Sequence, residues 1–81
     1  MITYFVVQSW KMGNKGVLIA EDPMEAPSVA AALSRARVLA TDRAGVIAFS
    51  RSGDPATGDW ADAVVLCEHG IVPLDLMELA S

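Results

Sequence analysis

The chain has 81 residues, of which 53% are hydrophobic and 20% are charged, and its formal net charge at neutral pH is −4. This length predicts one domain, residues 1–81, and the high apolar content excludes a disordered chain. The acidic balance excludes a general nucleic-acid binder, whose surface is dominated by lysine and arginine. Cys67 is the sole cysteine, which rules out an internal disulfide, and no apolar run reaches the ~20 residues that span a bilayer. We therefore expect a cytoplasmic protein that does not enter the membrane.

The first segment, residues 2–10, predicts a β-strand that is apolar on both faces. One face carries Ile2, Tyr4, Val6 and Trp10. A strand of this kind belongs in the centre of a sheet. Because one layer of helices covers only one face, we expect the second face to meet another subunit. The loop of residues 11–16 has the glycines of a hairpin, and residues 17–20 are expected to form the return strand.

A helix is predicted over residues 28–43, with Gly45 available to end it. Residues 22–25 resemble a capping box and are expected to form a first helical turn. Apolar side chains recur at helical spacing on one face, at Val29, Ala32, Leu33, Ala36, Leu39 and Ala40. Ala31 and Val38 lie on the opposite face. They are candidates for a partner contact, and the alternative is an ordinary exposed helix surface.

Residues 45–60 read GVIAFSRSGDPATGDW and begin with an apolar run that predicts a buried strand over residues 46–49. A polar turn of residues 51–59 follows, punctuated by glycine and proline. Residues 60–69 are predicted to form a second helix, because one helical face collects Trp60, Ala63, Val64 and Cys67. The consecutive apolar residues 64–66 also fit a strand, and this alternative stays open.

The resulting order predicts a small α+β fold, a ββαβα two-layer sandwich with a three-stranded antiparallel sheet. The first strand lies in the centre of that sheet. If residues 60–69 form a fourth strand instead, the order becomes ββαββ. Residues 74–79 are expected to add a last short turn or helix.

The predicted topology separates charges between the two ends of the sheet. One end gathers the basic residues Lys11, Lys15 and Arg43. The other end gathers the acidic residues Glu21, Asp22 and Glu25 beside the turn of residues 51–59. Three cations could touch a phosphate backbone but are too few for strong binding. Nucleic acid is therefore not expected as a partner.

The turn of residues 51–59 has three interpretations. The favoured one is structural, because Asp54-Pro55 starts a turn and Asp59 can cap the next element. In the second, a small anion is bound by side chains and free amides of Arg51, Ser52, Gly53, Thr57 and Gly58. The third is a divalent metal held by Asp54 and Asp59, whose spacing lacks the alternating oxygen ligands of a calcium loop. No metal or cofactor is expected.

No catalytic residue is predicted. Ser50, Ser52 and His69 occur without an elbow motif or a recognisable triad order. Cys67 and His69 would share a face in a strand but not in the favoured helix, so a buried, inert Cys67 is expected.

The two tryptophans are assigned different roles. Trp60 is expected to pack in the core at the start of the second helix. Trp10 lies beside the charged hairpin and is the candidate for contact with a partner.

Three stretches carry a resemblance to known proteins: YFVVQSW near the start, VIAFSRSGDPATGDW in the middle, and residues 70–73. Together they resemble a family of small bacterial proteins of unknown function. The resemblance covers most of the chain and implies no activity and no catalytic residues.

The leading functional prediction is a non-catalytic domain that self-associates, as a homodimer, or binds another protein. The apolar excess and the two-faced first strand favour it. The alternative, from a different class, is a protein that binds a small anionic ligand through the turn of residues 51–59.

Overall fold

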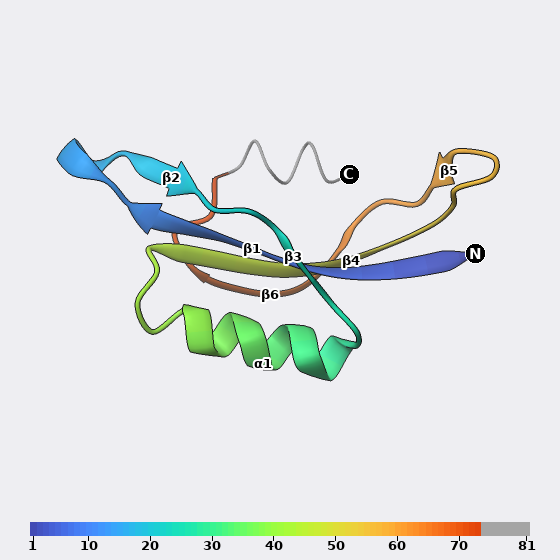
Figure 1. The fold of residues 1–81 in the computed structure, drawn as a ribbon, viewed down its shortest axis with the longest axis horizontal. Coiled ribbons are helices and arrows are strands. Elements are labelled where there is room, and N and C mark those ends of the chain that lie inside the picture. Colours follow the sequence, from blue (N-terminus) through green and yellow to red (C-terminus); the bar gives the residue numbers. More distant parts are fainter. Residues whose placement is uncertain (74–81) are drawn as a thin grey trace.

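The computed structural model describes residues 1–73 and shows one curled antiparallel sheet of six strands with a helix on one face (Figure 1). The strands are β1 (Ile2–Met12), β2 (Leu18–Ala20), β3 (Met24–Ala26), β4 (Gly45–Asp54), β5 (Asp59–Trp60) and β6 (Val64–Gly70). The helix α1 spans Val29–Leu39, and a short 3-10 turn, Asn14–Gly16, closes the first hairpin. The predicted turn at residues 74–79 lies outside the described residues.

Two long strands form the centre of the sheet. β1 and β4 pair from Ile2 opposite Gly53 to Trp10 opposite Gly45. β2 and β3 both pair with the outer side of β1, while β6 and β5 both pair with the outer side of β4. The sheet is therefore four strands wide, and each outer position is shared by two short strands.

Each shared outer position contains one extra residue. β1 advances three residues from Val7 to Trp10, whereas its outer partner advances four, from Ala20 to Met24. The other side has the same mismatch between β4 and the segment that joins β5 to β6. Extra residues of this kind bend and twist a sheet. Figure 1 shows the result, since the ends at β2 and β5 both rise on the side opposite α1.

The core lies between α1 and the sheet. It consists of small and medium apolar side chains: Val7, Ala26, Ala32, Ala36, Val46 and Ala48. Alanines on the inner face of α1 allow the helix to approach the sheet closely. The helix begins at a hydrogen bond of 3.1 Å from the backbone N–H of Ala31 to the Ser28 hydroxyl. Such an N-cap satisfies a donor that the first helical turn leaves free.

The predicted ββαβα sandwich with a three-stranded sheet is wrong. Residues 60–69 contribute to two strands, β5 and β6, rather than to a second helix. The physical reason lies in β4, where Val46 and Ala48 are fully buried. The backbone of a buried strand needs hydrogen bonds along both sides, and β6 supplies them on the outer side. Val64 and Val65 are β-branched and favour a strand, although the spacing of the apolar residues had suggested a helix.

Three further boundaries differ from the expectation. β4 continues to Asp54, so its last four residues are strand rather than turn. Residues 24–26 form β3 instead of a first helical turn, because their backbone pairs with β1. The helix ends at Leu39, and turns carry the chain on to Arg43.

The predicted separation of charges is also incorrect. Glu21 lies beside Arg43, whose Nε donates a hydrogen bond of 2.5 Å to the Glu21 carboxylate. Asp42 accepts a second bond from the same guanidinium, and the Ser9 hydroxyl donates to Glu21. Arg43 is thus neutralised by its neighbours, which weakens the case for a basic end that contacts nucleic acid.

Candidate functional site

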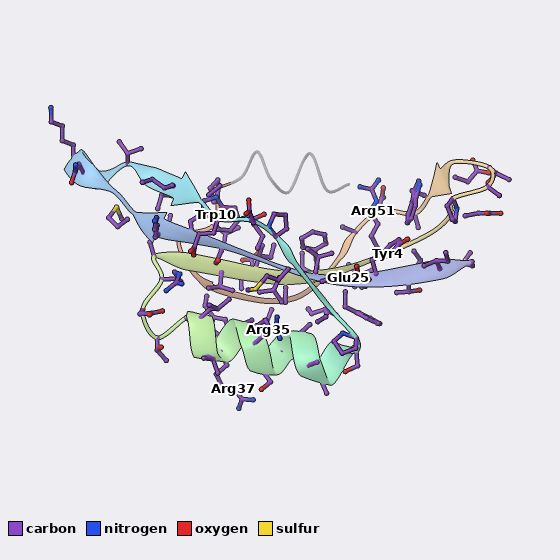
Figure 2. All side chains as sticks on the ribbon, viewed as in Figure 1. Tyr4, Trp10, Glu25, Arg35, Arg37 and Arg51 are labelled. Atoms are coloured by element: carbon purple, nitrogen blue, oxygen red, sulfur yellow. The ribbon has the colours of Figure 1, made fainter. Side chains whose placement is uncertain are left out.

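A pocket of about 370 Å³ opens on the face of the sheet that points away from α1. Its lining residues come from three strands: Tyr4 and Val6 from β1, Phe49 and Arg51 from β4, and Trp60 from β5. The strand period explains this grouping. Val7 and Ala48 face the helix, so the residues next to each of them face the other way. Figure 2 shows Tyr4 and Arg51 on this side, toward the end of the sheet that carries β5.

Two stacked aromatic rings form one wall of the pocket. The ring centroids of Tyr4 and Trp60 lie 5.7 Å apart with an angle of 28° between the planes. The indole lies across Gly53, where an added Cβ would be only 2.4 Å from two indole carbons. A glycine at this strand position therefore makes room for the stack. Trp60 lines the pocket and keeps 38% of its surface exposed.

Arg51 contributes the positive charge of the pocket. It stands directly opposite Tyr4, at the point where the outer partner of β4 changes from β6 to β5. Its side chain is half-buried, and its Nε atom is buried without a hydrogen-bond partner. Within residues 1–73 no carboxylate pairs with its guanidinium, in contrast to Arg43. A buried donor without an acceptor is costly, and such an atom in a native fold calls for an explanation.

The remaining residues of the predicted anion site do not join Arg51 in this pocket. Ser52 points to the opposite face of the sheet, where its hydroxyl lies 2.8 Å from that of Thr3. Gly53 supports the indole of Trp60. Thr57 and Gly58 lie in the turn after β4. Of the five predicted residues, Arg51 is the one whose side chain lines the pocket.

The backbone amides of that turn already donate hydrogen bonds within the turn itself. The N–H groups of Thr57 and Gly58 donate to the backbone oxygen of Asp54 at 3.2 and 2.8 Å. The N–H of Ala56 donates to the Asp54 carboxylate, and that of Asp59 donates to the Thr57 hydroxyl. No amide of this turn is left to bind an anion, because Pro55 has none to offer.

The other predicted chemistry finds no support in the described part of the chain. Asp54 and Asp59 lie opposite each other on β4 and β5, but no group of three potential metal ligands occurs in residues 1–73. Cys67 and His69 share the helix-facing side of the sheet, and no hydrogen bond joins their side chains.

The predicted interface residues lie apart from one another. Trp10 is only 5% exposed and leaves little surface for a partner, while Ala31 packs partly against the core. Val38 is 67% exposed on the outer side of α1. The expected burial of the two tryptophans is therefore reversed: Trp10 is buried, while Trp60 is 38% exposed because the second predicted helix, which would have covered it, does not form.

The sequence contains a signal for the pocket in the alternation of its two long strands. Tyr4 and Val6 share one face of the first predicted strand, and Arg51 is the cation of the predicted anion site. Extending β4 by its period of two places Phe49 and Arg51 on one face. The alternation does not reveal how the two strands pair, and the register of that pairing decides which residues become neighbours.

No helix among the described residues has the length and apolar character needed to cross a membrane. Comparisons of the chain with protein-family models, with curated protein sequences and with solved structures give no match.

Proposed function

We propose that this domain binds a small anion with an apolar body in the pocket beside Arg51. The observation that carries the proposal is the buried Nε of Arg51, which has no hydrogen-bond partner, in the wall of an otherwise apolar pocket. The Nε atom itself is enclosed by protein, so an anion in the pocket would meet the outer part of the guanidinium, for which residues 1–73 supply no carboxylate. The aromatic and aliphatic lining gives the rest of the ligand an apolar surface to contact.

The energies of such a site are favourable. A hydrogen bond to a charged group contributes about 1.5–3 kcal/mol, and apolar contact adds roughly 25 cal/mol for each Å² removed from water. The pocket volume lies at the lower end of the range for ligand sites, about 300–1,000 Å³. These features support binding and orientation of a small molecule. The lining offers no carboxylate, histidine or thiol for acid–base or nucleophilic chemistry.

The test is a calorimetric titration of the full chain with phenylacetate, a small carboxylate with an apolar body. Arg51→Met removes the charge while keeping an unbranched apolar stem, and we expect binding to weaken by about tenfold or more. Arg37→Met is the matched control, because Arg37 projects from α1 away from the sheet (Figure 2) and should leave binding unchanged. Equal affinity in the wild type and in Arg51→Met, with both proteins folded, would contradict the proposal.

Self-association is a second candidate function, and the same face of the sheet favours it. Ile2, Trp60 and Val65 lie on this face by register and are 42%, 38% and 38% exposed. A second copy that packs on this face would cover them. Sedimentation equilibrium over a wide concentration range checks this candidate, and a strictly monomeric species at high concentration would exclude it.

We also propose a cytoplasmic location. The support is the free thiol of Cys67, since an unpaired cysteine suits a reducing compartment.

A further inference from the structure

We propose that the ligand of the Arg51 pocket is an aromatic monocarboxylate, with its ring against the aromatic wall and its carboxylate on the guanidinium. This inference rests on the proposed anion-binding function and adds the chemical class of the ligand. Two observations carry it: the aromatic composition of the lining and the charges that surround Arg51.

The lining favours a planar ring over a flexible chain. Three of the four residues that accompany Arg51 are aromatic, namely Tyr4, Phe49 and Trp60. The Tyr4–Trp60 stack is already in place, and Trp60 keeps 38% of its surface exposed. Aromatic rings gain energy from stacked or edge-to-face contact beyond the area they bury, and a rigid ring loses little conformational freedom on binding. The pocket volume suits one small ring system.

The surrounding charges favour a carboxylate over a phosphate. Arg51 is the one cation among the lining residues, and its planar fork matches two carboxylate oxygens. An acidic residue lies on the same face of the sheet: Glu25 stands opposite Val6, which lines the pocket. The negative charge of a neighbouring carboxylate repels a bound dianion more strongly than a bound monoanion. The free amides that usually hold a phosphate are absent, because the turn after β4 uses its own.

The experiment compares four probes with the full wild-type chain. Phenylacetate is the reference ligand, and cyclohexylacetate has the same carbon skeleton without aromaticity. Phenylacetamide is neutral, and phenyl phosphate carries a dianion in place of the carboxylate. Calorimetry gives the affinities. The indole N–H resonance of Trp60, assigned with Trp60→Phe, reports ring contact, and the resonance of the buried Trp10 is the internal control.

We expect phenylacetate to bind about three- to tenfold tighter than cyclohexylacetate, although the latter is the more apolar molecule. It should bind about tenfold or more tighter than phenylacetamide, and tighter than phenyl phosphate. The Trp60 resonance should shift on titration while that of Trp10 stays in place. All these comparisons use the wild-type chain, so they do not depend on whether a variant folds.

The outcomes separate the ligand class from the proposed function. Equal affinity for cyclohexylacetate, or an unmoved Trp60 resonance, would overturn the aromatic ligand while leaving anion binding intact. Tighter binding of phenyl phosphate would overturn the carboxylate. If none of the anionic probes binds, or if binding survives Arg51→Met, the proposed function falls together with this inference.

Discussion

At the scale of single residues, Gly53 determines the shape of the pocket. Glycine inside a strand normally weakens it, because it has no side chain to pack and more freedom to lose. Here the space above Gly53 is filled by the indole of Trp60, which in turn reaches Tyr4. The pocket wall therefore depends on the absence of a side chain at Gly53.

Gly53→Ala tests this dependence. Strand propensity alone would make alanine favourable, but the new methyl group would overlap the indole. We expect the free energy of unfolding to fall by about 1–3 kcal/mol, the usual cost of overpacking, and the Trp60 indole N–H resonance to shift. Ala61→Ser, an exposed change next to Trp60, should do neither. A Gly53→Ala protein as stable as the wild type would show that the indole does not rest there.

Glu21 is a second residue with a measurable role. The hydrogen bond from Arg43, with that from Ser9, holds the pKa of the Glu21 carboxyl below its ordinary value of 4.5, against the opposing effect of burial. The charged carboxylate thus links the end of the first hairpin to the loop between α1 and β4.

This lowered pKa predicts a pH-dependent stability. Because the folded-state pKa lies below that of the unfolded chain, the contribution of Glu21 is complete above about pH 4.5 and is lost as the pH falls through the folded-state pKa. We expect Glu21→Gln to unfold at lower urea concentration than the wild type at neutral pH, with the difference closing in acid. Asp22→Asn, at an exposed neighbour, should show a smaller difference. A gap that is constant across pH would refute the role of this charge.

At the scale of elements, α1 had the strongest signals in the sequence. The apolar residues of its inner face recur at helical spacing, and Ser28 is a residue type that commonly caps the start of a helix. Both signals are local, so they can be seen without knowledge of the rest of the fold.

The cap gives a direct test of the start of the helix. Ser28→Ala removes the acceptor for the Ala31 N–H and should lower the free energy of unfolding by about 1 kcal/mol. Ser34→Ala, at an exposed position within the same helix, should leave stability unchanged or slightly higher, because alanine is the better helix former. Chemical denaturation of the two variants checks both. Equal losses would mean that the cap contributes nothing specific.

The strands were harder to predict than the helix. The apolar runs in β1 and β4 and the hairpin loop before β2 identified three of them, but β3 and β5 have only three and two residues and carry no pattern of their own. They form because longer strands beside them need partners. The same need turned residues 64–70 into strand against a helical spacing. Local periodicity does not reveal how distant segments pair, so the sequence alone could not show that Tyr4, Phe49 and Trp60 lie around Arg51.

At the scale of the whole molecule, the sheet has two unlike faces. One carries α1 and the core, while the other curves inward at both ends and holds the Arg51 pocket (Figure 1). The described chain is also thin in one direction, with extents of 43 × 25 × 16 Å. Both functional candidates, the small anion and a second copy, would use the face opposite α1.

Use of one face by two occupants makes them competitors. If copies of the chain pair through the pocket face, phenylacetate should shift the equilibrium toward monomer, because a ligand favours the species to which it binds. Sedimentation equilibrium with and without phenylacetate measures this shift, and phenylacetamide is the control. A dimer whose proportion is unaffected by saturating ligand would place the interface elsewhere.

The divided outer strands have a consequence for aggregation. A long, regular edge strand offers a row of free backbone groups on which strands from other molecules can assemble into fibrils. Here one edge is split between β2 and β3 and the other between β5 and β6, each with an extra residue, and β6 itself has a register shift opposite Ala48 and Phe49. An incoming strand could follow either edge for only a few residues before its hydrogen bonds fell out of step. This chain can thus expose apolar surface for a ligand without offering a template for fibril growth.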